Sequence, residues 1–76
     1  MDKSAWAEHL QRDEWFQEMM EELRGAEIAK FASSDYMDTE QREQAYMRLR
    51  ALELIDTYLD GIVAQKTIEA KKLKIL

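Results

Sequence analysis

Few side chains in this sequence have the type and spacing that metal binding or catalysis requires. His9 and Asp13 lie four residues apart, so on a helix they would share one face and could supply two metal ligands. No third ligand is evident near them, and the chain lacks the His-Glu-x-x-His pattern of zinc proteases. The sequence therefore favours an ordinary exposed helical histidine over a metal site.

Nucleophilic and phosphate-binding chemistry has equally little support. Ser33 and Ser34 have no glycine elbow around them and no second base nearby, which favours a role in ending a helix. Gly25 and Gly61 alone cannot form a glycine-rich phosphate loop. We therefore expect no enzyme and no bound metal or cofactor.

The composition indicates which fold must carry these residues. The 76-residue chain has no proline and only two glycines, which allows long helices and provides few of the turns that a sheet needs. This predicts a single all-α domain over residues 1–76. A core of this size gives little stability, and no cysteine with one histidine leaves oligomerisation as the expected supplement.

Hydropathy and charge limit the partners. No apolar run approaches the roughly 20 residues of a membrane span, and no signal-peptide core follows the first residues, so we expect a protein made in the cytosol without a membrane partner. Residues 1–61 carry seven Lys and Arg against fifteen Asp and Glu, a net charge of −8. Residues 62–76 carry four Lys against one Glu, a net charge of +3. Such a surface repels phosphate backbones, so nucleic-acid binding is not expected unless the basic tail acts alone.

A long first helix is predicted over about residues 4–32. Ser4 can cap its N-terminus, and a bend or break is expected near Arg12 and Asp13, where two apolar stripes fall out of phase. Gly25 suggests the close approach of another helix. The stripes consist of Trp6 and Leu10, and then of Phe16, Met20 and Leu23. An acidic face, open to solvent or to a basic partner, carries Glu14, Glu18, Glu21 and Glu22.

A second helix over about residues 39–60 has the clearest start, because Asp38 can act as its N-cap. Apolar positions alternate at spacings of four and three, as in helices that pack at a shallow angle. This seam consists of Ala45, Leu49, Leu52, Asp56, Leu59 and Val63. Asp56 is either a buried specificity device or an edge residue near Arg48 and Arg50, and the edge position is favoured.

A second apolar stripe lies on a neighbouring face of the same helix. It consists of Met47, Ala51, Leu54, Tyr58 and Ile62. A hairpin of two long helices covers only one stripe, so the other must meet the C-terminal segment or another copy of the chain. We predict that it is an oligomer interface. Gly61 offers a natural C-cap, so the helix is expected to stop or kink there, with 62–76 as a short helix or tail.

Two further groups are candidate partner-binding residues. Trp6, Trp15 and Met19 could form an adaptable groove, since tryptophan dominates interface hot spots and methionine repacks easily. Core packing is the favoured interpretation for Met19 and Met20, whereas an interface is as well supported as the core for Trp15. The basic group consists of Lys71, Lys72 and Lys74. Solvation is its default role, but the tail is expected near the acidic first helix of its own or a neighbouring subunit.

One stretch suggests a biological setting. From Asp38 the chain reads Asp-Thr-Glu-Gln-Arg-Glu-Gln-Ala-Tyr-Met-Arg-Leu-Arg-Ala-Leu, and Leu59-Asp60-Gly61 follows. With its acidic cap, Arg-Glu, aromatic residue, Arg-Ala-Leu run and later glycine, this stretch resembles small uncharacterised helical proteins encoded in the structural gene regions of tailed bacteriophages. The resemblance implies a location in the host bacterial cytoplasm or the virion, with other phage structural proteins as further partners.

Two classes of function follow. The first is a non-enzymatic phage protein that self-associates and acts in virion assembly or stability through protein–protein contacts. The second is an acidic regulatory binder or inhibitor of a host protein, including a nucleic-acid mimic, motivated by the acidic face between Asp13 and Glu27. Copurification with virions or with a host enzyme would separate the two.

Overall fold

The computed structural model describes the backbone of residues 2–75 and the side chains of residues 2–66 and 68. Over this part of the chain three α-helices follow one another, α1 (Lys3–Arg12), α2 (Glu14–Ser33) and α3 (Thr39–Ile75), and no strand occurs. The predicted all-α class is confirmed. Within the same described residues, no helix combines the length and the apolar character needed to cross a membrane.

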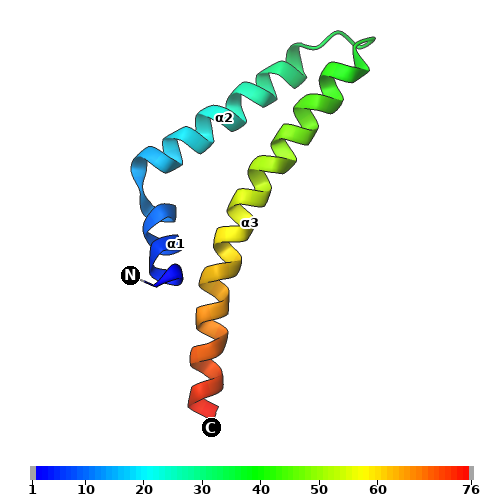
Figure 1. Cartoon of the computed structure of the whole chain (residues 1–76). Coiled ribbons are helices and arrows are strands. Elements are labelled where there is room, and N and C mark those ends of the chain that lie inside the picture. Colours follow the sequence, from blue (N-terminus) through cyan, green and yellow to red (C-terminus); the bar gives the residue numbers. More distant parts are fainter. Residues whose placement is uncertain (1, 76) are drawn as a thin grey trace.

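Helix α3 is the axis against which the other two helices pack. Its 37 residues span about 55 Å at 1.5 Å per residue, and the whole molecule measures 59 × 25 × 13 Å. Helix α2 runs back along α3 from the connecting loop, and α1 turns so that it lies beside the middle of α3 (Figure 1). The radius of gyration is 17.2 Å, against about 11 Å for a compact chain of this length. The chain is thus a rod with a large surface.

A single residue, Asp13, separates α1 from α2. Its backbone is extended, and its carboxylate accepts a hydrogen bond from the Phe16 N–H at 2.8 Å, which caps α2. Its own N–H donates to the Leu10 carbonyl at 3.2 Å, which satisfies the end of α1. The predicted break near Arg12 and Asp13 is confirmed.

The predicted cap of α1 is wrong, because the helix begins one residue before Ser4. Asp2 is the N-cap, and its carboxylate accepts a hydrogen bond from the Ala5 N–H at 2.7 Å. That hydrogen bond, with a smaller contribution from the positive charge of Lys66, lowers the pKa of Asp2 below its ordinary value. The Ser4 hydroxyl is buried in the first turn and makes no hydrogen bond within the described residues.

The loop between α2 and α3 is held by Arg42. Its guanidinium donates to the carbonyls of Asp35 at 2.6 Å and Tyr36 at 2.7 Å. Asp38 accepts a hydrogen bond from the Gln41 N–H at 3.0 Å, so the predicted N-cap of α3 is confirmed. Arg42 therefore ties the loop to the first turn of the helix that follows it.

Helix α3 does not end at Gly61, so the expected division into a helix over 39–60 and a separate segment over 62–76 is wrong. Among the described residues no glycine has a positive φ, and α3 continues without interruption to Ile75. The close helix approach expected at Gly25 is also absent, since a Cβ atom built at either glycine would meet nothing within 4 Å. One interior glycine costs about 1 kcal/mol, which the surrounding helix-forming residues outweigh.

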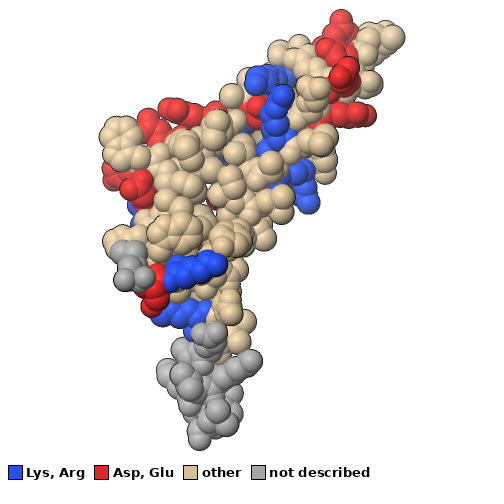
Figure 2. Space-filling model, viewed as in Figure 1, with Lys and Arg blue, Asp and Glu red and all other residues tan. Residues whose placement is uncertain are grey.

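The core is small. In the described part of the chain four apolar residues are buried, namely Ala7, Met20, Ala45 and Leu59. The predicted seam of α3 supplies two of them, and its other members are half-buried. Only Met20 and Leu59 have large side chains, whose burial contributes roughly 1.5–3 kcal/mol each. Residues other than Lys, Arg, Asp and Glu cover much of the visible surface (Figure 2), and many large apolar side chains are exposed, among them Trp15, Met47 and Leu54.

Because Gly61 lies inside a regular helix with open space around it, Gly61→Ala should stabilise the chain by roughly 0.5–1 kcal/mol. Urea denaturation at fixed protein concentration, followed by circular dichroism, measures the change. Gly25→Ala has the same surroundings and should give a similar increment. A loss of stability at Gly61 alone would indicate a left-handed backbone there.

Candidate protein-interaction surface

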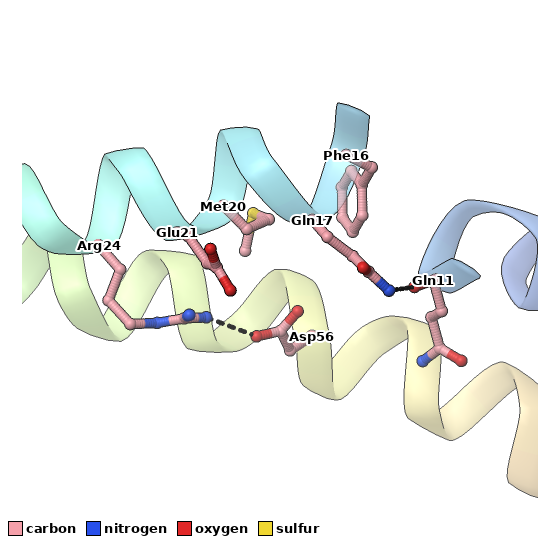
Figure 3. A pocket seen from close by; sticks show the side chains of 7 residues that line it. All are labelled: Gln11, Phe16, Gln17, Met20, Glu21, Arg24 and Asp56. Atoms are coloured by element: carbon pink, nitrogen blue, oxygen red, sulfur yellow. Dashed lines mark hydrogen bonds and ion pairs between the residues drawn. The ribbon is translucent and has the colours of Figure 1, made fainter. Parts of the chain in front are cut away.

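Polar contacts join α3 to both other helices. The Arg24 guanidinium on α2 pairs with the Asp56 carboxylate at 2.9 Å (Figure 3), and Gln11 on α1 donates to Asp60 at 2.7 Å. The side-chain amide of Gln17 donates to the backbone carbonyl of Gln11 at 2.7 Å and so ties α2 to α1. These contacts fix how α1 and α2 are placed along α3.

Asp56 therefore does not have the environment that the sequence analysis favoured. Its position in the seam turns it toward α2, where it meets Arg24 and not the neighbouring Arg48 or Arg50. Arg50 pairs with Glu53 on its own helix at 2.8 Å. The side chains of Arg24 and Asp56 are 40% and 45% exposed, so the pair contributes at most about 1 kcal/mol, and it orients the helices more than it stabilises them.

Glu27 is the buried charged residue of the described chain, with 9% of its surface exposed. Its carboxylate lies 3.3 Å from the Lys30 ammonium on the same helix and 3.5 Å from the Arg48 guanidinium on α3. The oxygen near Arg48 makes no hydrogen bond, so that contact is an ion pair only. Glu27 and Arg48 also line a shallow apolar groove between α2 and α3, together with Leu23, Ala51 and Leu52.

The outer face of α3 is apolar and open. Met47 and Leu54 are each 68% exposed and Tyr58 is 54% exposed, while Ala51 is exposed and Ile62 half-buried. At 100° per residue Leu54 lies about 180° around the helix from Ala45 of the buried seam, whereas Ile62 lies about 100° from it and adjoins the start of α1. The C-terminal segment continues the same helix and does not fold back over this face. We call Met47, Ala51, Leu54, Tyr58 and Ile62 the outer stripe.

The apolar surface is wider than the sequence analysis predicted. Ile55, which is 42% exposed, lies four residues after Ala51 and three before Tyr58, so it broadens the outer stripe on one side. The same helical spacing that identified the outer stripe could have identified it. Near the loop, Phe31, Tyr46 and Met47 line a second apolar groove with Arg42 and Glu43.

The proposed partner-binding tryptophans are both accessible. Trp15 is 81% exposed in the first turn of α2, and Trp6 on α1 is 44% exposed. Core packing is confirmed for Met20, which is 4% exposed, whereas Met19 points outward. Since Trp15 and Met19 are four residues apart on α2, they share one face of that helix.

The basic tail meets α1 at its first lysine. Lys66 lines a depression with Asp2, Lys3 and Ser4 at the start of α1, and its charge acts favourably on the Asp2 carboxylate. The Lys3 ammonium in turn lies 5.5 Å from the centre of the Tyr58 ring, within cation–π range. The side chains of Lys71, Lys72 and Lys74 lie outside the described residues.

The acidic face of α2 is open to solvent, with Glu14, Glu18, Glu21 and Glu22 all exposed. His9 is exposed as well, and within the described residues no three His, Cys, Asp or Glu side chains gather where they could hold a metal ion. In comparisons with protein-family models, curated proteins and solved structures, nothing matches this chain.

The surroundings of Glu27 predict an asymmetry between two substitutions. Arg48→Leu leaves a buried carboxylate with only Lys30 near it and should cost about 1 kcal/mol or more, because the charge remains desolvated. Glu27→Leu removes the buried charge beside apolar neighbours and should change stability by less than about 0.5 kcal/mol. Thermal unfolding of the two variants tests this, and equal losses would contradict it.

Proposed function

We propose that this chain is a non-enzymatic protein that acts by self-association, a helical hairpin whose second copy covers the outer stripe. The observation that supports this is the exposed apolar face of α3 opposite its buried seam. A helix with apolar side chains on two opposite faces is typical of a buried helix, and here only one face is covered within the chain. Several large apolar side chains exposed on one helix face are characteristic of protein–protein contact sites.

The accessible surface is large enough for such a contact. The chain exposes 6346 Å², whereas a compact monomer of 9.0 kDa exposes about 4,900 Å² by the scaling of surface with mass. The excess is about 1,500 Å², and one partner in a standard interface buries about 800 Å². A second copy could therefore bury its share of an interface from this excess alone.

For the biological setting we propose virion assembly or stability in a tailed bacteriophage, which rests on the resemblance of residues 38–61. In such a role the self-associated protein would contact other phage structural proteins. Recovery of the chain from purified virions by mass spectrometry tests this part. If the protein is absent from virions but present in infected cells, the proposed role in the virion is refuted. The proposed self-association is not affected by that result.

A second candidate function is supported by a different face. The exposed glutamates of α2 form an acidic surface with little basic charge beside it (Figure 2), as expected of a regulatory binder that occupies a basic site on a host protein. Reversal of Glu18 and Glu22 to Lys would abolish capture of such a host protein. The same substitutions should leave self-association through α3 unchanged.

Replacing Leu54 by Glu should convert the oligomer into a folded monomer, because it places a charge in the middle of the outer stripe without touching the buried seam. Sedimentation equilibrium at micromolar concentration should then give 9.0 kDa, with the helical circular dichroism retained. Thr57→Glu adds the same charge at an exposed position off the stripe and should leave the oligomer intact. A wild-type chain that is itself monomeric would refute the proposal.

A further inference from the structure

We infer that the second copy lies antiparallel to the first, with the two α3 helices packed through their outer stripes about a two-fold axis between Leu54 and Ile55. This inference rests on the proposed self-association and adds its geometry. Three features of α3 support it: the order of large and small residues in the stripe, the distribution of charge along the helix, and the side on which α1 and α2 pack.

The order of side chains fits an antiparallel pair. The stripe begins at Met47 and ends at Ile62, so its midpoint falls between Leu54 and Ile55. In this register Ala51 of one copy faces Tyr58 of the other, which pairs the smallest member of the stripe with its largest. A parallel pair in register would place alanine against alanine and tyrosine against tyrosine, leaving a gap at one level and crowding at the next.

The charges favour the same direction. Residues 35–43, at the loop end of α3, carry four acidic side chains and one arginine, a net charge of −3. Figure 2 shows these acidic side chains gathered at that end of the molecule. Residues 62–75, which form the other end of α3, carry a net charge of +3. A parallel pair brings like charges and aligned helix dipoles together, whereas an antiparallel pair places each acidic end beside a basic one.

The fold leaves most of this face free: Met47 and Leu54 are 68% exposed, and Tyr58 is 54% exposed although Lys3 of α1 lies beside its ring. Ala45 and Leu59 of the seam are buried under α2 and α1, so these two helices of each copy lie on the far sides of the pair. The outer stripe has members at spacings of four and three, which suits two helices crossing at about 20°. From Met47 to Ile62 the contact runs for about 22 Å along the middle of a 59 Å rod.

Disulfide trapping tests the direction, because the chain has no cysteine of its own. In the antiparallel pair Leu54 lies beside its own copy near the axis, so Leu54→Cys should form a covalent dimer under mild oxidation. The two copies of Met47 are about 22 Å apart, beyond the roughly 7 Å limit between disulfide-linked Cα atoms. Met47→Cys should therefore form about tenfold less covalent dimer than Leu54→Cys. Glu22→Cys, exposed on α2, is the control for random collision.

A mixture of two variants tests the register. Ala51→Cys and Tyr58→Cys should each form little covalent dimer alone, since each faces the other in the second copy, and should form a mixed dimer when combined. The oligomeric state of the wild-type chain is measured by sedimentation equilibrium in the same buffer. Equal trapping of Met47→Cys and Leu54→Cys would indicate a parallel pair and overturn this inference. A wild-type dimer in which neither residue is trapped would place the interface elsewhere, whereas a wild-type monomer would refute the proposed self-association itself.

Discussion

The rest of the structure depends on one constraint: α3 carries more exposed apolar side chains than α1 and α2 cover. Helices α1 and α2 contain 10 and 20 residues and pack on the seam that includes Ala45 and Leu59. The remaining residues extend α3 instead of folding back over it. Within the described residues the outer stripe therefore stays largely exposed, with Leu54 at its centre.

A core of few large side chains leaves the relative placement of the helices to polar contacts. The pair of Arg24 and Asp56 joins α2 to α3, and the hydrogen bond from Gln11 to Asp60 joins α1 to α3. Arg42 holds the loop between α2 and α3. Exposed contacts of this kind contribute about 0 to 1 kcal/mol each, so they select one alignment without making the monomer stable. A chain held in one alignment presents its outer stripe in a single geometry, which the proposed self-association would require.

The sequence predicted those features that depend on local chemistry. The all-α class followed from the scarcity of proline and glycine, the break at Asp13 from two stripes out of phase, and the N-cap at Asp38 from its side chain. The errors had local causes in one case and tertiary causes in another. Gly61 has the residue type of a C-cap, but the helical pattern on both sides of it outweighs the cost of one glycine. The partner of Asp56 could not be predicted, because it depends on the alignment of α2 with α3 and Arg24 is 32 residues away.

The two candidate functions use different surfaces and are therefore physically compatible. Self-association would bury the outer stripe of α3, whereas the exposed glutamates lie on α2, which packs on the opposite side of α3. In the antiparallel pair the two α2 helices would lie on the far sides, so both acidic faces would remain open. Such a dimer would display two acidic surfaces related by a two-fold axis, and a partner with two basic sites linked across the pair would gain from the high effective concentration of the second site. Self-association would then strengthen binding at the acidic face without any change in that face.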